Sequence, residues 1–221
     1  MDLKDEQLLS SKNKSTNTSD AQPSKPVVEH ENRLAPFNPT SDQVQETALN
    51  ILALKKDDVL FDLGCGDARL LVTAAQQMEG LRCVGIEMDP IFASRAKERV
   101  RKLSSDETRK RIEIREGDVL ELGYASVMQP VGTDEGDIGE LCRSVTFLND
   151  ASALYLFLVP NGLKKIKPLL DRVVEIRKEQ KRSFSVVAYM FQIPEWEPIL
   201  VDRSSKADVP LYLYRFEAQS D

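Results

Sequence analysis

Residues 61–70 read FDLGCGDARL, and this stretch decides the fold. Two glycines and two aspartates follow an apolar run, so the pattern predicts a buried strand over 59–62, a tight turn, and a helix over 68–78. Gly64 and Gly66 permit backbone conformations closed to other residues, and without a Cβ they let a ligand approach the main chain. The turn is therefore either a plain link between strand and helix or a ligand-binding loop.

The composition favours one globular domain. The chain has 221 residues, of which 41% are hydrophobic, and this is enough for a sizeable core. Its formal net charge of -6 disfavours nucleic-acid binding, which relies on Lys and Arg against phosphates. No apolar stretch reaches the roughly 18 residues that are needed to span a bilayer. We therefore expect neither a nucleic-acid partner nor a membrane span.

The cysteines and the single histidine argue against several kinds of site. Cys65, Cys83 and Cys142 are odd in number and form no CxxC pair, which disfavours a disulfide framework or a zinc site and indicates a reducing compartment. We expect a cytoplasmic protein without a bound metal. His30 lies in a polar N-terminal segment, so we do not expect a histidine base in the core, nor a triad hydrolase.

The N-terminal segment, residues 1–34, is rich in Ser, Asn, Lys, Asp and Gln and poor in large apolar side chains. Such a segment buries too little surface to offset the entropy lost on ordering, so we expect a disordered arm. It lacks the apolar run of a secretory signal and the Arg-rich, acid-poor character of a transit peptide. The folded domain is expected over residues 35–221.

Several local patterns in this domain predict where helices begin or are interrupted. Thr40 and Gln43 fit a capping box at the start of a helix. Asp89 followed by Pro90 is a strong start for another, because the carboxylate can cap and proline suits the first helical position. Pro168 should interrupt or kink a helix late in the chain, because proline lacks the backbone N–H.

Strand patterns alternate with these helices, and an acidic Gly-rich stretch at 132–140 is expected to form a surface insertion. Alternation of strand and helix predicts an α/β fold with right-handed crossovers, a mostly parallel sheet and helices on both faces, closed by a C-terminal antiparallel strand pair. The further strands are expected at 81–87, within 111–122, at 151–159, at 183–191, at 198–202 and at 211–216.

Acidic residues recur where three of the expected strands end. Asp62 ends the first strand, Glu87 ends the second and lies 21 residues after Gly66, and Asp118 follows the third. An acidic group in the position of Glu87 can accept hydrogen bonds from both ribose hydroxyls of a nucleoside. Asp118 is placed to accept from an adenine amino group and Val119 to pack on the ring. The sequence therefore favours a nucleoside ligand at this edge of the sheet.

Phosphate-bearing ligands fit the same edge less well. A pyrophosphate would meet the carboxylates of Asp62 and Asp67, and the GxGxxG fingerprint requires a small residue where this chain has Arg69. No Lys-Ser or Lys-Thr follows the turn, as a Walker-type phosphate loop would require. A nucleoside with a cationic centre, such as S-adenosylmethionine, suits the carboxylates better.

Three segments resemble motifs I, II and III of the seven-strand (class I) S-adenosylmethionine-dependent methyltransferases. They are DLGCGD at 62–67, VGIE at 84–87 and GDV at 117–119. The resemblance spans roughly residues 35 to 216 and implies a Rossmann-like seven-strand sheet. Ala68 stands where many members carry a third glycine. The cofactor contacts that this resemblance implies are Asp62, Gly64, Cys65, Gly66, Arg69, Glu87, Met88, Asp118, Val119 and Thr40.

Three longer segments resemble a branch of protein lysine methyltransferases that includes those acting on the ATP synthase c subunit. They are PFNPTSDQVQETALNIL at 36–52, ALYLFLVPNGLKKIKPLL at 153–170 and SVVAYMFQIPEWEP at 185–198. This resemblance implies a protein substrate methylated on a lysine ε-amine, but not which protein. The aromatic residues considered for its channel are Tyr155, Tyr189 and Trp196, with Phe157 and Phe191 as further candidates; ordinary core packing is the alternative for each of them.

Two other functions stay open at this point. One is a small-molecule or RNA methyltransferase on the same fold, and the other is a cofactor-binding partner subunit without catalysis. Residues 158–161 read LVPN rather than the Asn/Asp-Pro-Pro-Tyr/Phe of enzymes that methylate exocyclic or amide nitrogens, so adenine-N6 and glutamine-amide acceptors are disfavoured. The sequence identifies no catalytic base.

Overall fold

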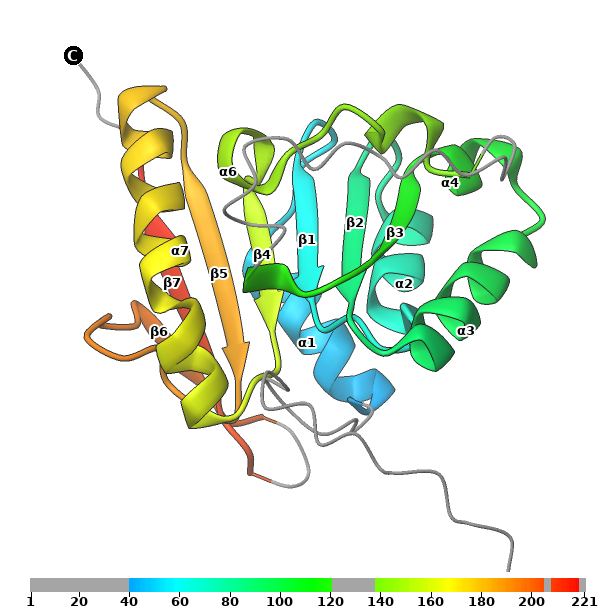
Figure 1. Ribbon diagram of the computed structural model, residues 1–221. Coiled ribbons are helices and arrows are strands. Elements are labelled where there is room, and N and C mark those ends of the chain that lie inside the picture. The colour runs from blue at the N-terminus through cyan, green and yellow to red at the C-terminus, as the bar shows by residue number, and fades with distance from the viewer. Residues whose placement is uncertain (1–39, 121–137, 205–207, 219–221) are drawn as a thin grey trace, which may run out of the picture. The chain divides into compact units, whose positions relative to one another are not determined.

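A seven-stranded mixed sheet with helices on both faces forms the folded part of the chain, as the computed structural model shows (Figure 1). The structure describes residues 40–120, 138–204 and 208–218. The strand order is β3-β2-β1-β4-β5-β7-β6. The expected arm, residues 1–34, lies outside the described residues. No helix within the described ranges is long and apolar enough to cross a membrane.

β7 alone runs opposite to the other six strands, and this mostly parallel sheet with its C-terminal antiparallel pair confirms the expected fold class. β1 pairs with β2 and β4, β2 with β3, and β4 with β5, all in parallel, whereas β7 is antiparallel to both β5 and β6. The strands are β1 (Val59–Leu63), β2 (Arg82–Glu87), β3 (Ile112–Glu116), β4 (Ala153–Leu156), β5 (Phe184–Tyr189), β6 (Leu200–Asp202) and β7 (Leu211–Phe216).

Helices cover the sheet on both sides. One buried cluster joins the sheet to α1 (Asp42–Leu52), α2 (Arg69–Gln77) and α3 (Pro90–Arg101). The opposite cluster joins it to α7 (Pro160–Glu179) and α6 (Phe147–Asp150). All five residues of β1 are buried, because helices cover both faces of this central strand. The short helices α4 (Asp106–Lys110) and η1 (Glu140–Cys142) pack against β3.

Two helix predictions were wrong in detail. The cap of α1 is Ser41, whose hydroxyl accepts from the Val44 amide, whereas the Thr40 side chain bonds elsewhere. Pro168 lies inside α7 and does not interrupt it. Pro168 and the residue four positions earlier, Lys164, are both exposed, so water can satisfy the carbonyl that loses its helical donor. The predicted cap of α3 is confirmed: Asp89 accepts from the Ile91 amide at 2.9 Å.

The acidic Gly-rich stretch is only partly described, since residues 121–137 lie outside the described ranges. Its last residues do not form a free surface insertion. Ile138 packs against the buried cluster, and a Cβ on Gly139 would lie 2.8 Å from the Glu113 Cβ. Cys142, which follows shortly after, is wholly buried. This end of the stretch is therefore docked on β3.

Close packing between β2 and the glycine turn holds the turn against the sheet. A Cβ on Gly85 would lie 2.6 Å from the Cys65 Sγ and 2.8 Å from the Leu71 Cδ1. Both neighbours are buried, so they have little room to move. The glycine of β2 is thus required for the turn and α2 to approach the sheet.

We expect Gly85→Ala to lower the free energy of unfolding by about 2 kcal/mol, because the added methyl overpacks this contact. Urea denaturation of the variant and the wild type measures the difference. In a Cys65→Ala background the loss should be smaller, because the nearest clashing atom is gone. An unchanged free energy of unfolding for Gly85→Ala would contradict the close contact.

Candidate cofactor site

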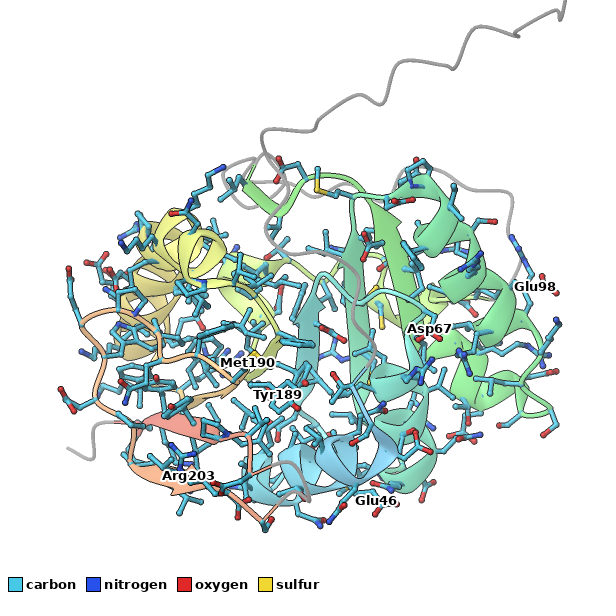
Figure 2. The ribbon with its side chains drawn as sticks, turned by 90° about the horizontal axis from the view of Figure 1, so that it is seen from below. Glu46, Asp67, Glu98, Tyr189, Met190 and Arg203 are labelled. Carbon is cyan, nitrogen blue, oxygen red and sulfur yellow. The ribbon has the colours of Figure 1, made fainter. Side chains whose placement is uncertain are left out.

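The parallel strands all end at one edge of the sheet, which Figure 2 shows from below. Asp67 lies at this edge on the side of α3, and Tyr189 and Met190 lie at the end of β5. Ligands of open α/β sheets bind beyond the carboxyl ends of the strands, where the strand order reverses. That reversal falls between β1 and β4, so the glycine turn after β1 borders it.

The glycine turn adopts backbone conformations that favour glycine. Gly64 and Gly66 have φ of 86° and 56°. The amides of Gly64 and Cys65 both donate to the Ile86 carbonyl, at 2.8 and 3.1 Å. A Cβ on Gly64 would meet only the Leu158 Cδ2, at 3.8 Å, among the described residues, and Gly64 is exposed. The space over Gly64 is thus open to a ligand, and this supports the ligand-loop interpretation of the turn.

The Glu87 carboxylate is fixed at the end of β2. Its Oε2 accepts from the Gly66 amide and its Oε1 from the Asp89 amide, both at 2.9 Å. Glu87 is 9% exposed. Each carboxylate oxygen has two lone pairs, so both oxygens keep capacity for a further donor such as a ribose hydroxyl.

Asp62 is buried beside this carboxylate. Burial, and after it the negative charges of Glu87 and Asp67, raise the pKa of Asp62 to about 8. At neutral pH the Asp62 side chain therefore carries a proton for most of the time. A cation placed beside it would lower this pKa and stabilise the ionised form.

Asp118, the third of the acidic residues predicted at strand ends, directly follows Gly117 at the exit of β3. The Gly117 amide donates to the Glu87 carbonyl at 3.0 Å, which joins this exit to the end of β2. Asp118 Oδ1 accepts from the Leu120 amide at 2.9 Å, and Val119 is buried. One carboxylate oxygen of Asp118 is thus engaged locally, and the second accepts no hydrogen bond from the residues that the structure describes.

Arg69, predicted as a cofactor contact, bonds to the turn. Its guanidinium donates to both carboxylate oxygens of Asp67, at 3.0 and 2.7 Å. Arg99 of α3 donates to the same carboxylate at 2.8 Å and to the Asp67 carbonyl at 2.9 Å. Sequence reasoning missed Arg99, because no motif connects a residue of α3 to the turn. Met88, also predicted, is half-buried directly after Glu87.

Ala68 follows the turn with φ of 59°, a left-handed conformation, and is fully buried. The third glycine of the related motif would therefore suit the backbone conformation here as well as the close packing. Cys65 is buried and faces Gly85, and burial raises its thiol pKa well above the ordinary value. Its thiol is thus a packing group rather than a nucleophile.

One of the predicted channel aromatics, Tyr155, lies beside Asp62, and a second, Tyr189, lies at the end of the next strand, β5. Tyr155 of β4 is in register with Asp62 of β1, and its hydroxyl shares a 3.0 Å hydrogen bond with the Thr40 hydroxyl. Burial raises the pKa of Tyr155, so the hydroxyl stays neutral. Tyr189 packs edge-on against Phe157, with ring centroids 4.8 Å apart. Thr40 and Tyr155 are thus brought toward Asp62, whereas the packing of Tyr189 is shown against Phe157.

Trp196 is not brought to this group. Its ring packs against Tyr214 and Phe216, with centroids 5.6 and 4.8 Å away, and its Nε1 donates to Asp171 of α7. Phe216 pairs with Phe184, the first residue of β5, so Trp196 lies toward the opposite end of that strand from Tyr189. Trp196 is thus a partly buried residue that packs against the hydrophobic cluster on the α7 side of the sheet. Phe191 packs against the same buried cluster.

Comparison with known proteins gives one curated relative and a set of related folds. No protein-family model matches the chain. A protein-lysine N-methyltransferase of Saccharolobus islandicus is 27% identical over 181 residues, which cover 81% of this chain and 92% of that protein.

Solved structures with a similar fold include methyltransferases. An RNA methyltransferase of Salinibacter ruber, in complex with S-adenosyl-L-homocysteine, superposes with a TM-score of 0.60 at 24% identity and covers 83% of this chain and 97% of its own. A putative methyltransferase of Escherichia coli gives 0.52 at 16% identity and covers 85% and 92%. The chain thus has the Rossmann-like fold of class I methyltransferases.

The raised pKa of Asp62 predicts a specific pH dependence of stability. The unfolded chain loses the Asp62 proton near pH 4, whereas the folded protein holds it to about pH 8, so stability falls between these values. Asp62→Asn removes this loss. We expect the unfolding free energy of the variant, relative to that of the wild type, to rise by roughly 1 kcal/mol per pH unit in that window. Above the window this difference should level off.

Urea denaturation of both proteins between pH 4.5 and 9, expressed as a difference in unfolding free energy, measures this effect. Asp42→Asn, at an exposed position of α1, controls for the loss of one negative charge. A difference between Asp62→Asn and wild type that does not change with pH would contradict the burial of a protonated Asp62.

Proposed function

We propose that the protein is an S-adenosylmethionine-dependent methyltransferase that transfers a methyl group to the ε-amine of a protein lysine. The observation that carries the proposal is the grouping of Asp62 and Glu87 on the open glycine turn, at the carboxyl ends of β1 and β2. Similarity to a protein-lysine N-methyltransferase over 92% of that protein's length supports the choice of acceptor.

The residues present fit this cofactor. Glu87 is held by two amides with lone pairs to spare, which suits both ribose hydroxyls. The open space over Gly64 lets a ligand reach the main chain, and Asp62 offers an acidic group to the cationic part of the molecule. Asp118 and Val119 would hold the adenine at the exit of β3. When bound, this cofactor supplies an activated methyl group on a positively charged sulfur, whose departure as a neutral thioether favours transfer.

The acceptor side is aromatic and largely apolar. Tyr155, Phe157 and Tyr189 come from the ends of β4 and β5, on the side of Asp62 and α1. A lysine amine must be neutral to attack, and its pKa of about 10.4 falls when the ammonium is desolvated among such groups. The chain's part in the reaction is therefore to align the amine with the methyl group and to exclude water from it.

Incubation with cofactor carrying a labelled methyl group and a cell extract tests the acceptor class. We expect label in protein bands that resist nuclease, and on lysine after digestion and mass spectrometry. Asp62→Asn serves as the matched inactive control, because it removes the acidic group without changing side-chain size. Label that nuclease removes would instead identify an RNA acceptor, and cofactor binding without any transfer would identify a non-catalytic subunit.

A substitution at Gly64 tests the placement of the cofactor. Gly64→Ala costs about 1 kcal/mol of backbone strain, and its methyl group occupies the open face of the turn. We expect affinity for S-adenosylhomocysteine, measured by calorimetry, to fall at least tenfold.

Gly80→Ala is the matched control, because Gly80 has φ of 80° and its added methyl would meet Lys56 away from the turn. This variant should lose at least as much stability as Gly64→Ala and keep the wild-type affinity. Equal affinity for the ligand in Gly64→Ala and wild type would contradict the proposed placement.

A further inference from the structure

Arg99 reaches from α3 to the glycine turn with a single guanidinium that contacts one residue twice. Its Nη2 donates to Asp67 Oδ2 at 2.8 Å and its Nε to the Asp67 backbone carbonyl at 2.9 Å. Charge-assisted hydrogen bonds of this kind are shorter and stronger than neutral ones. Figure 2 shows Asp67 at the carboxyl edge, on the side of α3. The turn is thereby tied to a helix outside the cofactor motif.

Asp67 is suited to receive both guanidiniums. Burial alone would raise its pKa, but the hydrogen bond from Arg69 and the charge of Arg99 hold the pKa below its usual range. The carboxylate therefore stays ionised and accepts from Arg69 and Arg99 at once. Arg69 comes from the first turn of α2, so Asp67 joins the turn, α2 and α3.

The contact matters because Asp67 directly follows Gly66. The Gly66 amide donates to Glu87 Oε2, and this bond sets the orientation of the carboxylate that would receive the ribose. On the other side the turn is held by the Ile86 carbonyl, through the amides of Gly64 and Cys65. Without Arg99, the Asp67 carbonyl loses its side-chain donor and the Gly66 end of the turn loses its tie to α3.

We propose that Arg99 is a positioning residue for cofactor binding, which acts by holding Asp67, and through it the Gly66 amide, in the geometry that orients Glu87. Arg99 touches neither the cofactor nor the acceptor in this role. The inference rests on the proposed function, since it assumes that the turn and Glu87 bind the nucleoside.

The test compares three variants of the full chain by calorimetry with S-adenosylhomocysteine and by thermal unfolding. We expect Arg99→Gln to raise the dissociation constant about tenfold at unchanged stoichiometry. Arg99→Lys keeps the charge and can reach one acceptor, so a rise of about threefold is expected. Arg95→Gln, one helical turn away with its guanidinium over Phe92, should bind as the wild type does.

Amide hydrogen exchange separates positioning from a general loss of structure. Exchange in the peptide that contains residues 61–70 should be faster in Arg99→Gln, whereas exchange in β4 and β5 should match the wild type.

If Arg99→Gln does not fold, Arg99→Lys takes its place in the outcomes that follow. Dissociation constants within twofold of the wild type, or an equal rise in Arg95→Gln, would overturn the proposal. If wild-type protein binds no S-adenosylhomocysteine, the proposed function itself fails; if it binds and Arg99→Gln binds equally, only the role of Arg99 fails.

Discussion

The geometry of the site depends on the Glu87 carboxylate and the two amides that hold it. Gly66 reaches Glu87 from the turn after β1, and Asp89 reaches it from the start of α3. The Glu87 carbonyl also receives the Gly117 amide from the end of β3. One residue therefore joins the ends of three neighbouring strands, and the proposed ribose site exists only while these bonds fix the carboxylate in place.

This arrangement places Asp62 close to the carboxylates of Glu87 and Asp67, and ionising Asp62 in this buried place opposes folding. Asp62 has a pKa raised to about 8, because burial and the neighbouring charges disfavour its ionised form. Asp67 avoids the same penalty because Arg69 and Arg99 lie against it. A cationic ligand beside Asp62 would lower this pKa and favour the ionised carboxylate. Ionising this acidic cluster is thus unfavourable without a ligand and becomes favourable when a positive charge binds beside it.

Sequence reasoning succeeded where local patterns decide the outcome. The spacing of Asp62 and Glu87 places both at strand ends, and parallel strands bring such ends to one edge. It failed at the cap of α1, where two neighbouring hydroxyl residues, Thr40 and Ser41, both suit the position and Ser41 takes it. It also expected an interruption at Pro168, which is exposed and lies inside α7 without ending it. The contacts of Arg99 and Trp196 could not be predicted for another reason: their partners lie 32 and about 20 residues away, and only the tertiary arrangement brings them together.

A crystal structure of the protein with S-adenosylhomocysteine tests the central claim most directly. The account predicts that the Glu87 carboxylate accepts hydrogen bonds from both ribose hydroxyls while it keeps the Gly66 and Asp89 amides, and that the thioether lies over Gly64 on the side of Tyr155. A ligand bound away from the carboxyl ends of β1 and β2, or a Glu87 side chain turned away from the ribose, would contradict it.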